Sequence, residues 1–432
     1  MAPVVGVIPF AFPVGACYAS RKTHRGRPGR GTMQIAERVC RLGTETAFSV
    51  SAEAAAFASG GKTVYPFHLG DMNIPTPGNI AEAAIKAMRD GKTGYCPPCG
   101  IAELREVLAA DVNASHNTSY SAANVAIQPG GKPVIGKFIL ALMNAGDEVL
   151  YQNPGYPIYE SQIEFHGGRA VPYGYLQRNG ELRLDIDAMA RRITPRTRLL
   201  IVNDPHNPTG AACTQEELER LAELAIEHDL YVLADEAYFD IRYEGTRKSL
   251  ASVPGMLERC VILYTFSKKF AMTGWRLGAA IGPKDVIDVI ATLNVNDESC
   301  SNHFIQYGVL EGLTGDQSPV RRIIEILRQR RDTASGLLNA IPGVRCFTPQ
   351  ATFYLFPDVT EAMQRASLAD YETMRLTILR ETGVSVCTRL HFGRPSADED
   401  RMYLRFAYSG MDVSDIAEGI ARLTHFLEMR DP

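Results

Sequence analysis

Residues 265–278 read TFSKKFAMTGWRLG and overlap the end of an apolar segment, CVILYTF at residues 260–266. The continuous apolar run predicts a buried strand, and open α/β sheets bind their ligands beyond the carboxyl ends of such strands. A lysine amine there can form a Schiff base with a carbonyl, and a planar guanidinium can hold a phosphate with two parallel hydrogen bonds. Lys268 and Arg276 therefore indicate a site for a phosphorylated aldehyde. The alternative is that both are solvated surface charges, as most isolated Ser-Lys pairs are.

Two further apolar runs end in polar residues. LYVLADEAY (230–238) carries Asp235 and Tyr238 at its end, and LLIVNDPHNPTG (199–210) ends in a turn that contains Asn207. Taken alone, an acid at the end of a strand is more simply explained as the cap of the following turn. Three predicted strands with such ends are much less expected by chance, and they indicate one ligand site.

Strand patterns alternate with helix patterns along the chain. VAIQ (125–128) and DEVLYQ (147–152) have strand character, whereas TQEELERLAELAIEHD (214–229) has helix character and begins with a capping box of Thr214 and Glu217. This alternation predicts an α/β fold with a mostly parallel sheet covered on both faces. A long helix is predicted at residues 319–341.

Four motifs resemble, in order and spacing, those of the class I aminotransferases, the pyridoxal-phosphate enzymes of the aspartate aminotransferase family and of fold type I. They are NPTG (207–210), DEAY (235–238), SKKFAMTGWRLG (267–278) and YLRFAYSG (403–410), and the resemblance runs from about Met33 to the end of the chain. It implies a large domain, residues 70–325, whose mostly parallel seven-stranded sheet is covered by helices. A smaller α+β domain would combine residues 34–69 with residues 326–432.

The same resemblance implies roles for individual residues. Lys268 would carry pyridoxal 5′-phosphate, Asp235 would pair with the ring nitrogen, and Asn207 and Tyr238 would hydrogen-bond the phenolic oxygen. Lys268, Asp235 and Tyr238 are thus the expected catalytic residues. The other implied cofactor contacts are Gly130, Gly131, Lys132, Tyr156, Thr265, Arg276 and Tyr95, and the implied substrate contacts are Arg405, Gly70, Asn207 and Lys132.

These roles have physical reasons. A carboxylate beside the ring nitrogen favours its protonated form, which makes the ring a better electron sink. A lysine amine freed by the substrate can act as general base and then as general acid. Lys269 is not expected to compete with Lys268, because successive side chains of an extended loop point in different directions.

The segment PGGKP (129–133) is interpreted as a turn between a strand and a helix. Gly130 and Gly131 would let the backbone approach an anion at the start of the helix, although a plain tight turn is the simpler alternative. Tyr156 would stack on the cofactor ring. Tyr95 matches a tyrosine that reaches the phosphate of a neighbouring subunit, which implies a homodimer with shared active sites.

Composition excludes several classes of protein. The chain has 432 residues and a formal net charge of -4, which argues against nucleic acid as a partner, and no membrane association is expected. Nine scattered cysteines suit a reducing compartment. Cys96 and Cys99 have the spacing of a redox pair or half a zinc site, but an ordinary loop is the favoured interpretation and no metal is expected.

Residues 1–32 contain no acidic residue and carry five Lys or Arg between Arg21 and Arg30. We expect a disordered leader or an overextended start, with Met33 as the alternative first residue, and a cytoplasmic enzyme. An organellar transit peptide is the other possibility.

The expected substrates are an amino acid, held through its α-carboxylate by Arg405, and a 2-oxo acid as acceptor. Lys132 resembles a lysine that helps a subgroup of the family to bind acidic side chains, so aspartate or glutamate is favoured. The alternatives are alanine or an aromatic amino acid as donor, β-elimination or decarboxylation on the same cofactor, or a non-catalytic protein that only binds the cofactor.

Overall fold

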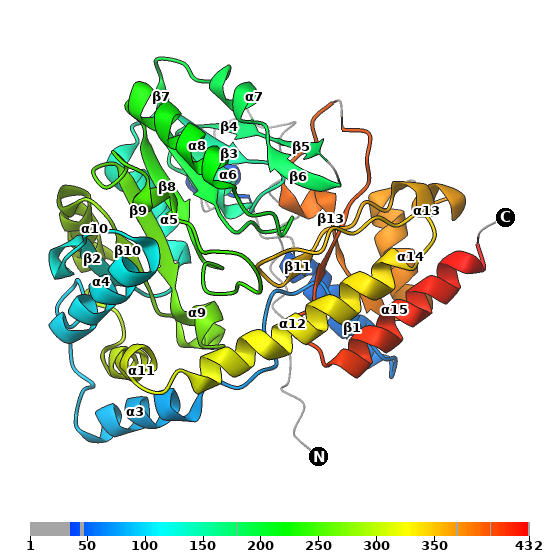
Figure 1. The fold of residues 1–432 in the computed structure, drawn as a ribbon, viewed down its shortest axis with the longest axis horizontal. Helices are drawn as coiled ribbons and strands as arrows, with labels where there is room; N and C mark the ends of the chain where they lie inside the picture. Colours follow the sequence, from blue (N-terminus) through cyan, green and yellow to red (C-terminus); the bar gives the residue numbers. More distant parts are fainter. Residues whose placement is uncertain (1–34, 44–46, 179, 369, 398, 431–432) are drawn as a thin grey trace, which may run out of the picture.

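The computed structural model describes residues 35–43, 47–178, 180–368, 370–397 and 399–430. The expected leader, residues 1–32, lies outside these ranges. Figure 1 shows a large α/β unit beside a smaller unit that contains the C-terminal helices.

The large unit is built on a seven-stranded sheet. Its strand order is β2-β10-β9-β8-β7-β3-β4, and only β10 runs antiparallel to its neighbours. The mostly parallel seven-stranded sheet is thus confirmed. The strands are β2 (Val125–Gln128), β3 (Glu148–Gln152), β4 (Arg169–Tyr173), β7 (Thr197–Asn203), β8 (Tyr231–Asp235), β9 (Cys260–Thr265) and β10 (Gly278–Ile281).

Helices cover both faces of this sheet. The main ones are α3 (Gly78–Arg89), α4 (Ala102–His116), α5 (Lys132–Leu142), α6 (Ile158–Phe165), α8 (Gln215–Glu227), α10 (Lys284–Asp297) and α11 (His303–Thr314). Short elements complete the unit: η3 (Ala122–Asn124), β5 (Tyr175–Arg178), β6 (Glu181–Leu184), α7 (Ile186–Ala190), η4 (Leu250–Ser252), α9 (Phe266–Lys269) and η5 (Thr273–Trp275).

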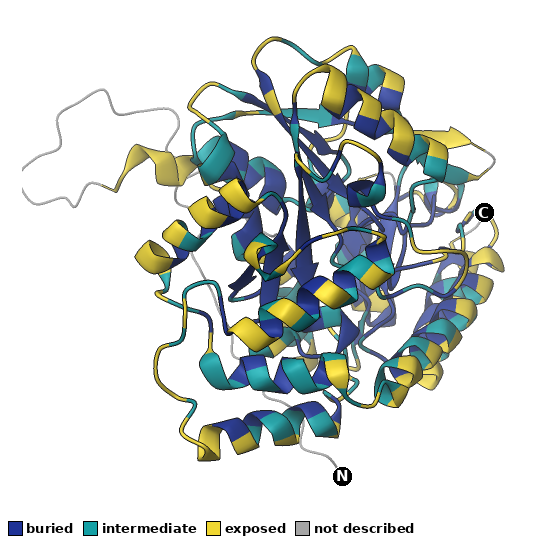
Figure 2. Ribbon diagram, turned by 60° about the vertical axis from the view of Figure 1, so that its left-hand side comes forward, coloured by how far each residue is buried: buried dark blue, intermediate teal, exposed yellow. Residues whose placement is uncertain are grey.

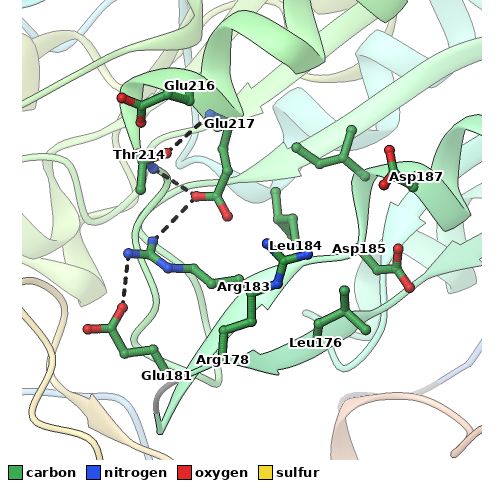
Figure 3. Close-up of a pocket in the computed structure, with 11 residues that line it drawn as sticks. Leu176, Arg178, Glu181, Arg183, Leu184, Asp185, Asp187, Thr214, Glu216 and Glu217 are labelled. Atoms are coloured by element: carbon green, nitrogen blue, oxygen red, sulfur yellow. Dashed lines mark hydrogen bonds and ion pairs between the residues drawn. The ribbon is translucent and has the colours of Figure 1, made fainter.

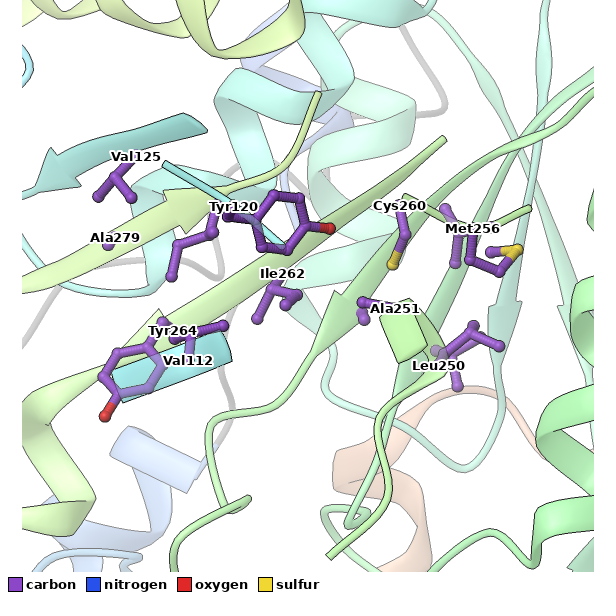
Figure 4. Close-up of a cluster of buried hydrophobic side chains, with 14 of the residues drawn as sticks. Val112, Tyr120, Val125, Leu250, Ala251, Met256, Cys260, Ile262, Tyr264 and Ala279 are labelled. Carbon is purple, nitrogen blue, oxygen red and sulfur yellow. The ribbon is translucent and has the colours of Figure 1, made fainter. Parts of the chain in front are cut away.

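Side chains of β9 alternate between two apolar clusters, as the two-residue period of a strand requires. Cys260, Ile262 and Tyr264 belong to the cluster under α4 and α8, part of which is drawn in Figure 4. Val261 and Leu263 belong to the cluster under α5, α6 and α10. Figure 2 accordingly shows the strands as mostly buried at the centre of the molecule, and the surrounding helices with a mixture of buried, intermediate and exposed residues.

The predicted capping box at the start of α8 is present. The Glu217 amide donates to Thr214 Oγ1 at 3.2 Å, and the Thr214 amide donates to Glu217 Oε2 at 2.8 Å. Two of the first amides of the region thereby find partners, which fixes where the helix begins.

The smaller unit joins residues from both ends of the described chain. β1 (Tyr65–Pro66) pairs in parallel with β12 (Val384–Ser385). In a second small sheet, β14 (Leu404–Ala407) lies between β11 (Tyr354–Leu355) and β13 (Cys387–Thr388). The remaining elements of the smaller unit are η2 (Glu37–Arg41), α2 (Ala47–Ser59), α12 (Ser318–Asn339), α13 (Thr360–Arg365), α14 (Tyr371–Thr382), η6 (Arg389–Phe392) and α15 (Val413–Glu428).

One apolar cluster holds the smaller unit together. It contains Tyr65 and Phe67 together with residues from Ile323 to Leu427, but also Tyr238 and Tyr243. The division at residues 70 and 325 stays a prediction, because this core draws on side chains from inside that range. No helix in the described part of the chain is long and apolar enough to cross a membrane.

Candidate active site

The parallel strands bring the predicted site residues to one edge of the sheet. β8 ends at Asp235 and β9 ends at Thr265, and Asn207 lies in the turn after β7. The first residue of β10, Gly278, pairs with Gln128 at the end of β2 and with Thr265 at the end of β9. The turn at Gly130 therefore lies beside the end of β9.

The lysine pair does not lie in an extended loop, and that part of the prediction is wrong. Residues Phe266–Lys269 form the one-turn helix α9, whose first turn is capped because Thr265 Oγ1 accepts from the Ser267 amide at 3.3 Å. A side-chain oxygen that satisfies a first-turn amide favours helix over extended backbone. Ser267, which also receives a hydrogen bond from Thr265 Oγ1 at 3.0 Å, was not predicted as a site residue.

The two lysine side chains nevertheless diverge. Lys268 Nζ donates to the Gly70 carbonyl at 2.9 Å and lies 5.4 Å from the centre of the Phe353 ring. Lys269 turns instead to Asp111, Asp240 and Tyr264. Successive residues of a helix are about 100° apart around its axis, which directs the two amines to different partners.

Asp235 is buried, with 5% of its surface exposed. Its Oδ2 accepts from the Tyr159 hydroxyl at 2.6 Å and its Oδ1 from the Ala237 amide at 3.2 Å. Burial raises the pKa of the Asp235 carboxyl to about 6, against the hydrogen bond from Tyr159, which lowers it. A cation beside this carboxylate would offset the burial, so the residue fits the nitrogen of a protonated pyridine ring.

Tyr159 was not predicted as a site residue. It lies on α6 and is fully buried, with its ring edge-on to Tyr156 at 5.7 Å. A buried tyrosine hydroxyl needs a polar partner, and in this chain the partner is the carboxylate of Asp235. The sequence NPGYPIY shows two tyrosines but not which of them is buried.

Arg405, on β14, is held between two aromatic rings. Its guanidinium carbon lies 4.6 Å from the Tyr354 ring centre and 4.7 Å from that of Phe392. Its Nη1 donates to Asn207 Oδ1 at 3.1 Å, but among the described residues its buried Nε has no hydrogen-bond partner. A buried donor without a partner is costly, and a substrate carboxylate would satisfy it.

Tyr238 lies next to this group. Its hydroxyl is 2.8 Å from that of Tyr354, and the Tyr354 hydroxyl approaches Gly70 so closely that a Cβ there would lie 2.2 Å from it. Gly70 is thus the point where the Lys268 amine, Tyr354 and the surroundings of Arg405 meet. Tyr354 was also missed from the sequence, because only the pairing of β11 with β14 brings it to Arg405.

A second group of residues forms a cradle that suits an anion. A Cβ on Gly130, whose φ is +102°, would lie 2.2 Å from Arg276 Nη2, and one on Gly131 would lie 2.9 Å from Leu263. Arg276 itself has a left-handed backbone, with φ 58°, and donates from Nη1 to the Thr273 carbonyl at 2.8 Å. The guanidinium thus lies directly against the glycine turn that precedes α5, and a helix start beside a guanidinium is an arrangement that suits a phosphate.

Lys132 and Tyr156 lie beside this cradle. Lys132 is the first residue of α5 and is exposed, and its Nζ is 5.7 Å from the centre of the half-buried Tyr156 ring. The edge-on contact between Tyr156 and Tyr159 connects this pair to Asp235.

Tyr95 is separate from the buried group. Its side chain is 88% exposed.

Cys96 and Cys99 are not arranged as a reactive pair. The Cys96 thiol accepts a hydrogen bond from Gln306 Nε2 at 3.2 Å. Burial raises the pKa of Cys96 to about 11 and also raises the pKa of Cys99. A raised pKa disfavours the reactive thiolate, and no group of metal ligands occurs among the described residues.

A surface hollow of about 570 Å³ lies elsewhere, between the β5-β6 hairpin and the start of α8. Figure 3 shows Arg183 in this hollow, paired with Glu181 and Glu217. It contains none of the predicted site residues, so the group at the strand ends is the candidate active site.

Comparison with known proteins agrees with this geometry. The family model for aminotransferase class I and II matches residues 63–423. Aspartate aminotransferase of Musicola paradisiaca is 32% identical over 378 residues, which cover 87% of this chain and 92% of that protein. Aspartate/prephenate aminotransferase of Thermus thermophilus is 33% identical over 394 residues, covering 90% and 98%.

Solved structures give the same result. Aspartate aminotransferase from Thermus thermophilus with maleate has a TM-score of 0.84 at 31% identity and covers 91% of this chain and 100% of its own. N-succinyldiaminopimelate aminotransferase from Mycobacterium tuberculosis also has a TM-score of 0.84, at 28% identity, with the same coverage.

The fold and the site define a pyridoxal-phosphate enzyme of fold type I. The chain belongs to the class I and II aminotransferases, as the resemblance of its motifs implied. Its cofactor is pyridoxal 5′-phosphate, and its reaction is amino-acid transamination, with a 2-oxo acid as acceptor.

Proposed function

We propose that this enzyme moves the amino group of an acidic L-amino acid, aspartate or glutamate, to a 2-oxo acid by a ping-pong mechanism, with Lys268 as the residue that carries the cofactor. The observation that carries the proposal is the pair of cations around residues 68–70. Lys268 donates to the Gly70 carbonyl, and Arg405 donates to the His68 carbonyl at 2.5 Å. An amino acid held by Arg405 through its α-carboxylate would therefore have its α-carbon near the Lys268 amine.

Pyridoxal phosphate, when bound, supplies an electron sink for the substrate's α-carbon. Asp235 would keep the ring nitrogen protonated, and Tyr238 with Asn207 would donate to the phenolic oxygen. Gly130, Gly131, Thr265 and Arg276 would hold the phosphate, and Tyr156 would stack on the ring. Lys268 would take the α-proton as general base and return it as general acid.

The preference for an acidic donor rests on Lys132. A cation at the start of a helix is unfavourable, because the positive end of the helix dipole lies there. The Lys132 ammonium lies over the Tyr156 ring. From there it could bind the side-chain carboxylate of an acidic substrate beside the cofactor. Relatives that are 31% and 32% identical to this chain are named aspartate aminotransferase.

We also propose a cytoplasmic homodimer with shared active sites. Tyr95 supports the dimer, because its side chain is 88% exposed although the neighbouring Cys96 is half-buried. A second copy of the chain could cover this exposed ring. Free cysteines support a reducing compartment. An organellar location is the alternative.

The test is a single half-reaction. Protein loaded with pyridoxal phosphate is mixed with one amino acid at a time, and 2-oxo acid, ammonia and the visible spectrum are measured. We expect aspartate and glutamate to yield one 2-oxo acid per site and to bleach the yellow colour without ammonia. Released ammonia would indicate a lyase, and a yellow colour that persists with every amino acid would indicate a binding protein.

A further inference from the structure

Lys269, the neighbour of Lys268, makes a set of buried polar contacts that transamination itself does not use. Its Nζ lies 3.2 Å from Asp111 Oδ2, 3.1 Å from the Tyr264 hydroxyl and 3.4 Å from Asp240 Oδ2, and its side chain is 9% exposed. The Tyr264 hydroxyl also donates to Asp240 Oδ2 at 3.3 Å. Four polar groups thus satisfy one another around the buried Lys269 ammonium, with Asp111 and Asp240 partly exposed.

These partners come from different elements. Asp111 lies on α4, Tyr264 on β9, and Asp240 in the turn at residues 237–240 that follows β8. Asp240 is fixed further by Arg247 Nη1, 3.2 Å from its Oδ1. In Figure 4 the ring of Tyr264 lies with the apolar cluster and its hydroxyl points away from Cys260 and Met256. Lys269 therefore ties α9 to the sheet and to a helix that covers it.

α9 needs such an attachment. It has four residues, and an isolated single turn of helix is unstable because its nucleation is unfavourable. The Thr265 cap fixes its beginning, and Lys269 fixes its last residue. Once the direction of Lys269 is set, the helix geometry sets the direction of Lys268, toward the Gly70 carbonyl.

The same contacts keep Lys269 charged. Burial alone would lower the pKa of the Lys269 amine, but Tyr264, Asp240 and Asp111 together raise it well above its ordinary value. A protonated amine has no lone pair with which to attack an aldehyde. Lys268 would carry the cofactor through a carbon–nitrogen bond that only an unprotonated amine can form, with the aldehyde oxygen lost as water.

We propose that Lys269 is a positioning residue: the ion pairs of its buried ammonium with Asp111 and Asp240 hold α9 so that Lys268 would face the cofactor, and they keep the second amine from reacting with it. This rests on the proposed role of Lys268. A cofactor found on no lysine of the wild-type protein would defeat that role. The experiments below instead compare variants with a wild type that is labelled at Lys268.

Lys269→Met removes the ammonium, and Lys269→Arg keeps the charge. Lys284→Met is the matched control, because Lys284 pairs with Asp288 at an exposed site. The rate of cofactor release from the loaded protein is measured during dialysis, with circular dichroism as the test of folding. We expect release roughly ten-fold faster for Lys269→Met, because Lys268 would lose the supporting contacts that fix its orientation. Lys269→Arg should restore most of the retention, and the control should match the wild type.

A folded Lys269→Met protein that only melts earlier, with wild-type release, would reduce Lys269 to a structural residue and overturn the proposal. If Lys269→Met does not fold, Asp240→Asn decides in its place, since it leaves Lys269 present and weakens its attachment. Faster release then supports the proposal, and wild-type release overturns it.

Competition between the amines is tested in Lys268→Ala. This protein is loaded with pyridoxal phosphate, reduced with borohydride and mapped by mass spectrometry. We expect no label on Lys269, because its ion pairs hold it protonated and turned away. A label there would overturn the second half of the proposal.

Discussion

Asp235 is a buried carboxyl whose ionised form is destabilised by its surroundings when no cation lies beside it. Its burial raises its pKa from 3.8 to about 6, so the folded protein binds its proton more tightly than the unfolded chain does. Stability from this group is present below pH 4 and is lost as pH rises through about 6. A pyridinium nitrogen would remove the penalty by supplying the opposite charge.

We therefore expect Asp235→Asn, without cofactor, to be more stable than the wild type at pH 8, by ~3 kcal/mol at 1.36 kcal/mol for each unit of pKa. The difference should vanish below pH 4, where the acid is protonated in both states. Urea unfolding at both pH values measures it. Equal stabilities at pH 8 would mean that the carboxylate is already compensated within the protein.

Lys132 gives a residue-scale prediction about specificity. If its ammonium pairs with a substrate carboxylate, Lys132→Ala should lower kcat/KM for aspartate and glutamate. The decrease should correspond to a loss of roughly 2 to 5 kcal/mol in transition-state stabilisation. Alanine as donor is the internal control and should be little affected. Equal losses for all donors, with weaker cofactor retention, would make Lys132 a phosphate ligand.

At the scale of elements, the strands and their polar ends could be predicted because apolar runs with sharp polar boundaries are local signals. β8 and β9 begin within one residue of the predicted apolar runs, and β7 begins two residues before its run. The helical turn α9 could not, because a four-residue helix depends on the Thr265 cap and on distant partners of Lys269. Tyr159 and Tyr354 could not be predicted as site residues for a related reason. The Tyr159 hydroxyl contacts Asp235, 76 positions away, and the Tyr354 hydroxyl contacts Tyr238, 116 positions away.

The glycine turn before α5 gives a prediction at this scale. Gly130→Ala would place a Cβ 2.2 Å from Arg276 Nη2 in a backbone of φ +102°, so we expect weaker cofactor binding in a folded protein. Gly146→Ala is the control, because Gly146 has φ +91° and nothing within 4 Å of its Cβ position. Its cost should be about 1 kcal/mol of stability, with cofactor binding unchanged. Cofactor affinity is measured by titration of the apo-proteins. Equal affinities in the two variants would contradict the proposal that the turn at Gly130 holds the phosphate.

At the scale of the whole molecule, motif order predicted the mostly parallel seven-stranded sheet. β1 pairs with β12, more than 300 residues later, and this contact has no signature in either segment alone. It follows only from the resemblance of the complete pattern. The core of the smaller unit also contains Tyr238 and Tyr243, and the division at residues 70 and 325 stays a prediction.

The shared-site dimer is tested by mixing subunits. Lys268→Ala homodimers should be inactive and Tyr95→Phe homodimers impaired. Hybrids have one site that combines an intact Lys268 with the partner's intact tyrosine, so purified hybrids should recover about half of the wild-type activity if the sites are shared. Hybrids no more active than half the Tyr95→Phe homodimer would show that Tyr95 acts within its own subunit.

The most direct test of the account is where the cofactor is attached. Wild-type protein is saturated with pyridoxal phosphate, reduced with borohydride, digested and mapped by mass spectrometry, with Lys268→Ala as the control. The account predicts one cofactor group per chain, on Lys268, and none in the control. A label on Lys269 or on another lysine, or no label in protein shown to be saturated, would contradict it.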